Sequence, residues 1–364
     1  MKKYSVVKEG IKKWILEEKY KPHEKIASEN ELADIFAVSR QTVRQAIGEL
    51  VNEGWLYREQ GRGTFCARRH DPEVAGRKSE KIIAVITTYI SDYIFPSIIR
   101  GAESYLSEKG YSILLSSTNN SLESEMHCLQ NILDRNIDGL IVEPTKSGGF
   151  NPNLNYYFTL ENNKIPYVMI NAYYSELNPI SLTMDDETGG YLATEHLIRL
   201  GHKKIAGLFK TDDLQGINRM KGYVRAHREY HLPIEPEMIL SYNTENKEFK
   251  LIQEAKQLMQ GKGTPEKPTA FVCYNDEIAL SLLDMARELG LHIPDDLSIV
   301  GYDDSTIATA SELTTIQHPK ARMGKDAAEL ILNMIESNKE QKIEPIIYQP
   351  TLIVRQSTAE AKSR

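Results

Sequence analysis

Short apolar runs alternate with longer amphipathic segments through most of this chain, and this alternation restricts the folds open to it. The segments between the runs place apolar residues at helical spacing, as in 187–200 and 277–289. Such a pattern predicts parallel strands joined by helices, an α/β fold. About ten strands exceed one compact sheet, so two lobes are expected over residues 81–364. The predicted strands include 82–87, 111–117, 138–142, 166–171, 204–209, 270–274 and 297–302.

Residues 1–69 follow a different pattern. Apolar residues recur at helical spacing within 7–15 and predict a first helix. Ser28 and Glu31 have the capping-box spacing that starts a second helix. A third helix is expected after a short turn, and then two short strands around a glycine-containing turn within 55–66. This order predicts a winged helix-turn-helix.

The third predicted helix separates its apolar residues from a polar face. Arg40, Gln41 and Arg44 share that face. Arginine can bond guanine and glutamine can bond adenine in the major groove, although a solvated helix face is the alternative. The predicted DNA contacts are Glu29, Ser39, Arg40, Gln41, Thr42 and Arg44 from the helices, and Gln60 and Arg62 from the wing. The two hydroxyl side chains suit phosphate oxygens, and Glu29 can accept from cytosine N4.

Charge is divided unevenly along the chain. Residues 1–70 contain 14 Lys+Arg and 10 Asp+Glu, whereas the rest contains 30 and 41. A basic head on an acidic body favours contact between the head and a polyanion, with chance variation as the alternative. The charged stretch 70–80 has no apolar periodicity and is predicted to link the two parts.

Polar residues follow several of the predicted strands in the body. In α/β folds, ligands lie beyond the carboxyl ends of the strands. Carboxylates, amides and guanidinium groups bond sugar hydroxyls, and aromatic rings cover an apolar sugar face. Helix caps are the alternative for Asn275 and Asp303, and a surface ion pair is the alternative for Arg219. The predicted effector contacts are Tyr93, Phe95, Glu143, Asn171, Arg219, Asn275 and Asp303.

Two family resemblances support these interpretations. The head is similar to GntR-type regulators in SENELADIFAVSRQTVRQAIGEL and EGWLYREQGRGTF. The body resembles the effector domain of LacI/GalR-type repressors, itself similar to periplasmic sugar-binding proteins, in INRMKGYVRAH, TAFVCYNDEIALSLLDMARELG and LTTIQHP. The second resemblance implies sugar contacts for Arg219, Asn275 and Asp303. Asn171 and His318 stand where many members of that family have aspartate and glutamine.

The pairing of this head with this body resembles the arabinose repressor group. That resemblance implies a repressor whose effector is L-arabinose and whose operators control arabinose-use genes. A dimer of the body would place two heads on two operator half-sites, so we expect a homodimer bound to double-stranded DNA. We expect no cofactor and no metal.

Two other classes of function are weighed against this one. A sugar receptor for transport or chemotaxis fits the body alone, but the N-terminal segment lacks the apolar run of a signal peptide. No run spans a bilayer, and the three cysteines are scattered, so we expect a cytoplasmic protein. An enzyme is disfavoured because no nucleophile elbow, metal cluster or P-loop is found, and His202 is expected to pack at a helix–strand turn.

Overall fold

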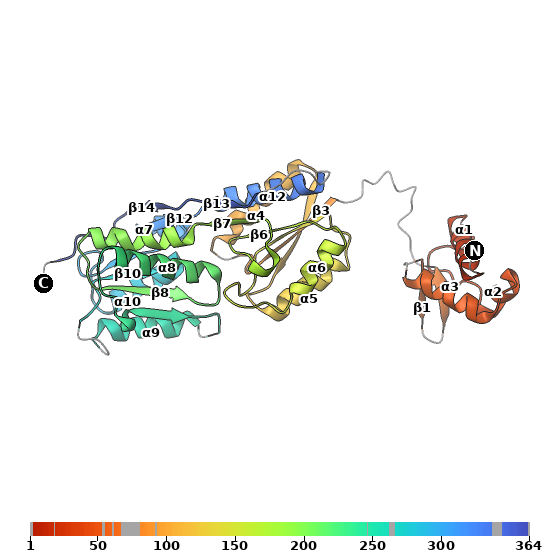
Figure 1. Ribbon diagram of the computed structural model, residues 1–364, viewed down its shortest axis with the longest axis horizontal. Coiled ribbons are helices and arrows are strands. Elements are labelled where there is room, and N and C mark those ends of the chain that lie inside the picture. The colour runs from red at the N-terminus through yellow and green to blue at the C-terminus, as the bar shows by residue number, and fades with distance from the viewer. Residues whose placement is uncertain are drawn as a thin grey trace. The chain divides into compact units, whose positions relative to one another are not determined.

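The computed structural model describes residues 3–17, 19–52, 55–59, 62–66, 81–91, 93–245, 247–261, 266–336 and 344–362. The chain separates into two compact units, Met1–Ser79 and Glu80–Arg364 (Figure 1). The predicted linker 70–80 lies outside the described residues. Across the residues that the structure describes, no helix is both long and apolar enough to cross a membrane.

The head forms the predicted winged helix-turn-helix. Its elements are α1 (Lys3–Leu16), α2 (Glu29–Phe36), α3 (Arg40–Asn52) and the antiparallel strands β1 (Leu56–Glu59) and β2 (Gly63–Cys66). Both bonds of the capping box are present, since Glu31 N donates to Ser28 Oγ at 3.3 Å and Ser28 N donates to Glu31 Oε2 at 2.7 Å. Ile11, Leu32 and Ile47 are buried in the small core that joins the three helices.

The first lobe of the body, the N-lobe, is built on a six-stranded parallel sheet with the order β13-β7-β6-β5-β3-β4. Helices α4 and α12 pack on one face and α5 and α6 on the other (Figure 1). Its strands are β3 (Lys81–Thr87), β4 (Tyr111–Ser117), β5 (Gly139–Val142), β6 (Tyr167–Ile170), β7 (Ser181–Met184) and β13 (Ile346–Tyr348). Its helices are α4 (Phe95–Glu108), α5 (Leu122–Leu133), α6 (Leu154–Asn162) and α12 (Lys320–Glu336).

The second lobe, the C-lobe, has a four-stranded parallel sheet with the order β11-β10-β8-β9 and a small antiparallel pair, β12-β14. Its strands are β8 (Ile205–Lys210), β9 (Ile239–Tyr242), β10 (Ala270–Cys273), β11 (Ser298–Val300), β12 (Thr315–Gln317) and β14 (Thr351–Ile353). Its helices are α7 (Asp186–Arg199), α8 (Leu214–Glu229), α9 (Lys247–Met259), α10 (Asp276–Glu288) and α11 (Thr306–Ala310). The two-lobed α/β prediction is thus confirmed, whereas the antiparallel pair was not predicted.

The chain passes between the lobes at three places, after β7, after β12 and after β13. Residues at the carboxyl ends of strands in both sheets line one cleft, among them Thr88 after β3 and Lys210 at the end of β8. Parallel strands collect loops at their carboxyl ends, and these loops carry the polar residues singled out in the sequence. His202 lies outside this cleft: it is buried at the turn before β8, where Nδ1 is 2.8 Å from Thr269 Oγ1, in agreement with its predicted packing role.

Helices α7 and α8 approach so closely that only glycine fits between their backbones. A Cβ on Gly190 would stand 2.1 Å from Arg219 O, and a Cβ on Gly222 would stand 2.0 Å from Glu187 O. Both contacts are with backbone atoms, which cannot move aside like a flexible side chain. The glycine of the R-x-x-G pattern thus serves helix packing, and that packing brings Arg219 beside Asp186.

Gly222→Ala should destabilise the Glu80–Arg364 unit by about 1–3 kcal/mol, because the added methyl group overpacks a backbone contact. Scanning calorimetry would show a lower melting temperature for this unit. Gly149→Ala is the control in the same unit, since nothing lies within 4 Å of its added Cβ. An unchanged melting temperature for Gly222→Ala would contradict the close packing of α7 on α8.

Candidate functional site

Glu29 connects the two predicted DNA-reading arginines in the head. Arg40 Nε donates to Glu29 Oε2 at 3.0 Å, and Arg44 donates through Nη2 to Oε2 at 3.1 Å and through Nε to Oε1 at 3.2 Å. The hydrogen bond from Arg44 is the main cause that lowers the pKa of Glu29. Both arginine side chains remain more than half exposed, at 59% and 62%. One carboxylate therefore orients two exposed guanidinium groups on the same face.

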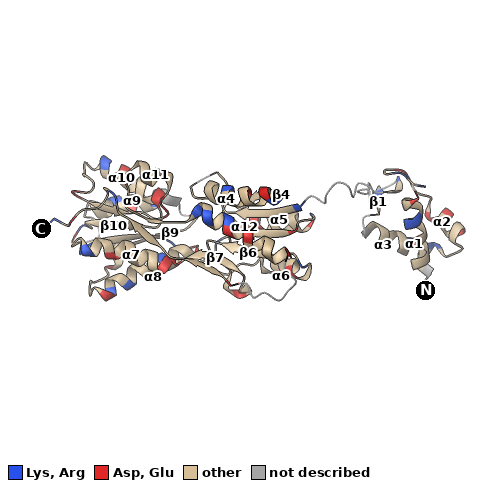
Figure 2. Ribbon diagram, turned by 90° about the horizontal axis from the view of Figure 1, so that it is seen from above, with Lys and Arg blue, Asp and Glu red and all other residues tan. Residues whose placement is uncertain are grey.

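The remaining predicted DNA contacts lie on α3, at its N-terminus and on the wing. Ser39 Oγ accepts from Thr42 N at 3.3 Å, so Ser39 caps α3. Gln41 is exposed beside them. Arg62 is exposed on the wing, with its guanidinium 5.9 Å from the centre of the Phe65 ring. Gln60 lies outside the described residues. Acidic residues are present on α2 (Figure 2), and Glu29 of this helix is the one bonded to Arg40 and Arg44.

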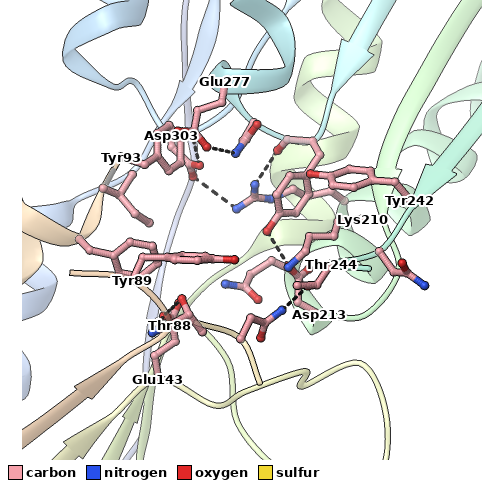
Figure 3. Close-up of a pocket in the computed structure, with 18 of the residues that line it drawn as sticks. Thr88, Tyr89, Tyr93, Glu143, Lys210, Asp213, Tyr242, Thr244, Glu277 and Asp303 are labelled. Carbon is pink, nitrogen blue, oxygen red and sulfur yellow. Dashed lines mark hydrogen bonds and ion pairs between the residues drawn. The ribbon is translucent and has the colours of Figure 1, made fainter. Parts of the chain in front are cut away.

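A pocket of about 310 Å³ lies between the lobes of the body. Six of the predicted effector residues line it: Tyr93, Phe95, Glu143, Arg219, Asn275 and Asp303. Figure 3 shows Tyr93 beside Asp303 at one side of the pocket, and Glu143 beside Thr88 at another. Asn171 is not among the lining residues, although it lies directly behind Glu143.

Arg219 is the buried centre of the pocket, with a side chain that is only 5% exposed. Its Nε donates to Asp186 Oδ1 at 2.8 Å, Nη1 donates to Tyr274 O at 2.6 Å, and Nη2 lies 3.4 Å from Asp303 Oδ1. The guanidinium also stacks 3.5 Å from the centre of the Tyr302 ring. Burial raises the pKa of Asp186 to about 6, against the opposing effect of Arg219. These contacts exclude the surface ion pair considered from the sequence.

Asp303 faces the pocket from the loop after β11 with an unusual backbone, φ +95°. Its Oδ2 accepts from the Tyr93 hydroxyl at 2.5 Å, and the same hydroxyl accepts from Asp276 N at 3.2 Å. Burial raises the pKa of Tyr93 well above its usual value, so the phenol stays protonated and donates. Tyr93 comes from the N-lobe, whereas Asp303 and Asp276 come from the C-lobe. The phenol therefore joins the lobes with its polar end, rather than only presenting a ring face.

Glu143 is fixed at the opposite side by neutral donors. Its Oε2 accepts from Thr88 N at 2.9 Å and from Thr88 Oγ1 at 2.5 Å, and its Oε1 accepts from Asn171 Nδ2 at 2.8 Å. Because Asn171 turns its amide nitrogen toward the carboxylate, its oxygen accepts from His318 Nε2 at 3.1 Å. Burial lowers the pKa of His318 to about 4, which keeps the ring neutral. Asn171 and His318 thus support Glu143 from behind.

Asn275 combines the two roles considered from the sequence. Its Oδ1 accepts from Ile278 N at 3.0 Å and caps α10, yet the residue also lines the pocket. Phe95, the first residue of α4, lines the pocket together with Tyr89, and their ring centres are 5.9 Å apart. These rings provide the apolar surface that the sequence predicted.

Sequence reasoning missed three charged residues of the pocket: Glu277, and the neighbouring pair Lys210 and Asp213. Lys210 Nζ lies 3.1 Å from Asp213 Oδ2, which also accepts from the Tyr274 hydroxyl at 2.6 Å. Both residues stand at the carboxyl end of β8, so the strand-end rule would have found them. The pocket walls carry the carboxylates Glu143, Asp213, Glu277 and Asp303 and the cations Lys210 and Arg219. Such walls suit a small neutral molecule rich in hydroxyl groups. Among the described residues, no cluster of side chains has the make-up of a metal site.

Comparisons with known proteins agree with this division of the chain. A model for bacterial regulatory proteins of the gntR family matches residues 3–66, and a model for a periplasmic binding protein-like domain matches residues 194–358. A ribose-bound LacI family transcriptional regulator from Enterococcus faecium is 27% identical with a TM-score of 0.65, covering 78% of this chain and 100% of that one. The transcription regulator CcpA of Lactococcus lactis shares the fold, with a TM-score of 0.67 at 22% identity over 77% of this chain and 99% of that chain.

Two curated relatives match nearly the whole chain. The arabinose metabolism transcriptional repressor of Halalkalibacterium halodurans is 56% identical over 99% of this chain and 98% of its own length. The repressor of the same description from Geobacillus stearothermophilus is 54% identical over 98% of both chains. The chain therefore belongs to the family of arabinose metabolism transcriptional repressors, with a GntR-type helix-turn-helix joined to a periplasmic-binding-protein-like body.

Proposed function

We propose that this chain represses arabinose-use genes in the cytoplasm by binding operator DNA through its head, and that L-arabinose in the pocket releases the operator. The observation that carries the proposal is the pocket itself, whose walls come from both lobes of a chain with a DNA-binding head. A ligand that contacts both lobes favours one arrangement of the lobes over others. Such a ligand can oppose DNA binding only if the two lobes are arranged differently in the DNA-bound protein.

The side chains of the pocket support a neutral sugar as the effector. Asp303, Asn275 and Glu143 offer acceptors for hydroxyl groups, and Arg219 offers donors. Tyr89 and Phe95 offer an apolar surface for one face of the ring. Four lining carboxylates against two cations disfavour a phosphorylated sugar. The names of the two closely similar relatives favour arabinose among the neutral sugars.

The proposed DNA contacts follow from the geometry of the head. Arg40 and Arg44, held side by side by Glu29, are proposed to bond guanine edges, with Gln41 beside them to bond adenine. The hydroxyls of Ser39 and Thr42 are proposed to contact phosphate oxygens. The wing residues Gln60 and Arg62 are proposed to reach a neighbouring groove or phosphate.

Two copies of the chain are proposed to bind two operator half-sites as a homodimer, because paired heads at fixed spacing match a near-palindromic site. A coupling free energy of about 1–3 kcal/mol between sugar and DNA would change operator affinity about 5–150-fold. The three passages of the chain between the lobes are the places where such a change of arrangement is expected.

The proposed function predicts that L-arabinose reduces binding to DNA from upstream of arabinose-use genes. A gel-shift titration at fixed salt should show a right-shifted binding curve with L-arabinose, and smaller shifts with D-xylose, D-ribose and D-galactose. Operator binding that no sugar in this panel alters would contradict the proposal.

Arg44→Ala should weaken operator binding by about 1–3 kcal/mol through loss of a base contact, while sugar affinity is unchanged. Fluorescence anisotropy with labelled operator measures the operator affinity, and calorimetry measures the sugar affinity. Lys13→Ala removes the same charge from an exposed site on α1 and should have a smaller effect. If both variants lose operator affinity equally, Arg44 contributes only its charge.

Arg219→Lys should weaken L-arabinose binding about 10–100-fold. The lysine ammonium keeps the positive charge between Asp186 and Asp303, but it lacks the several N–H donors that the planar guanidinium holds in fixed directions. Lysine is preferred to alanine, since alanine would leave two buried carboxylates without a cation. Arg225→Lys makes the same change on α8 at a site outside the pocket lining, beside Glu187. Calorimetry should find normal affinity in Arg225→Lys only; normal affinity in both variants would exclude Arg219 from the sugar site.

A further inference from the structure

A fully buried carboxylate, Glu125, lies in the N-lobe and is not among the residues that line the pocket. Among the described residues, four side chains donate hydrogen bonds to it, and all four are neutral. Its Oε1 accepts from the hydroxyls of Tyr157 at 2.9 Å and Tyr174 at 2.7 Å. Its Oε2 accepts from Asn151 Nδ2 at 2.7 Å and Asn153 Nδ2 at 2.9 Å. Burial of a carboxylate is costly, and here hydrogen bonds from these side chains offset that cost.

The two asparagines cannot turn their amide groups around without losing other bonds. Asn151 Oδ1 accepts from Asn153 N at 2.8 Å, and Asn153 Nδ2 also donates to Leu122 O at 2.7 Å. Both amides are therefore fixed with their nitrogen toward Glu125. Two fixed N–H donors therefore face Oε2 of Glu125, whereas the hydroxyls at Oε1 can donate or accept, and the Tyr174 hydroxyl also lies 3.0 Å from Thr145 O.

The Glu125 cluster fixes both ends of one loop, residues 144–151, called the latch loop. At one end, the Tyr174 hydroxyl that contacts Glu125 accepts from Thr145 N at 2.7 Å. At the other end, Asn151 is bound to Glu125 directly. Burial raises the pKa of Tyr174 well above its usual value, so its hydroxyl remains a donor to the carboxylate.

The tip of the latch loop contacts the C-lobe at the start of α8. Gly148 N donates to Asp212 O at 3.2 Å, and Ser147 Oγ accepts from Leu214 N at 3.0 Å. A Cβ on Gly148 would stand 2.9 Å from Thr211 O, so the approach is close. The same helix carries Arg219. The latch loop therefore binds the N-terminal end of the helix that presents Arg219 to the pocket.

We propose that Glu125 is a positioning residue for the effector site: it holds the latch loop against the start of α8 and so sets the affinity for the sugar. The inference rests on the proposed function of the pocket. Glu125 acts through the loop and touches no ligand. A carboxylate with a merely structural role would stabilise the N-lobe without any energetic coupling to the tip of the loop.

The test uses the full-length chain and L-arabinose as the probe. Glu125→Gln replaces four hydrogen bonds to a carboxylate with weaker bonds to a neutral amide and should weaken L-arabinose binding roughly tenfold by calorimetry. Operator affinity without sugar should stay within about twofold. Glu161→Gln is the matched control, since Glu161 also accepts from a tyrosine, Tyr167, at 2.8 Å in the same lobe but away from the latch loop. It should bind L-arabinose like the wild type.

A double-mutant cycle with Gly148→Ala separates positioning from simple stabilisation. Gly148→Ala should itself weaken sugar binding, because its methyl group pushes the tip of the loop away from Thr211. Adding Glu125→Gln to that variant should then change sugar affinity by less than about twofold. Independent effects that multiply in the double variant would overturn the proposal.

Tyr174→Phe provides a second route if Glu125→Gln does not fold. It removes the hydroxyl between Glu125 and Thr145 but keeps the ring against Tyr157, and should weaken sugar binding in the same direction. Tyr156→Phe is its control, since that hydroxyl contacts only Gln130 among the bonds described. Wild-type protein that fails to bind L-arabinose would overturn the proposed function, and the inference with it. Wild-type binding with unchanged affinity in the Glu125 and Tyr174 variants would overturn this inference alone.

Discussion

The buried guanidinium of Arg219 is the interaction on which the pocket depends. It joins α8 to Asp186 at the start of α7 and to Asp303 after β11, and it stacks on Tyr302. Three charges withdrawn from water are tolerated only because each has partners at hydrogen-bond distance. The close contact of α7 and α8 at their glycines places Arg219 where both carboxylates can reach it. Helix packing and pocket chemistry are therefore parts of one arrangement.

Ligand response follows from how this arrangement is divided between the lobes. The arginine and its carboxylates belong to the C-lobe, whereas Glu143 and Tyr93 approach from the N-lobe. Direct bonds already cross the cleft, from Tyr93 to Asp303 and from the latch loop to the start of α8. An effector in the pocket would have to act together with these bonds, so its affinity reports on the geometry of both lobes.

The strand-end rule predicted most of the pocket from sequence, because parallel strands bring their carboxyl ends to one edge. The rule could not predict which of these residues reach the pocket surface. Asn171 follows a strand as expected, but it lies behind Glu143 and does not line the pocket. Lys210 and Asp213 obey the rule and were overlooked. The pairing of Glu29 with two arginines could not be predicted, because it joins different helices at separations of 11 and 15 residues. Nor could the antiparallel pair β12-β14, since each strand has only three residues.

Sugar and operator are proposed to bind to opposing states of one chain, and reciprocal affinities are the sharpest test of this proposal. Thermodynamic linkage requires that L-arabinose lower operator affinity by the same factor by which operator lowers L-arabinose affinity. Titrating sugar by calorimetry with and without saturating operator, and operator by anisotropy with and without saturating sugar, gives both factors under one buffer condition. We expect two equal factors, each about 5–150-fold. Equal L-arabinose affinity in the free and the operator-bound protein would contradict it.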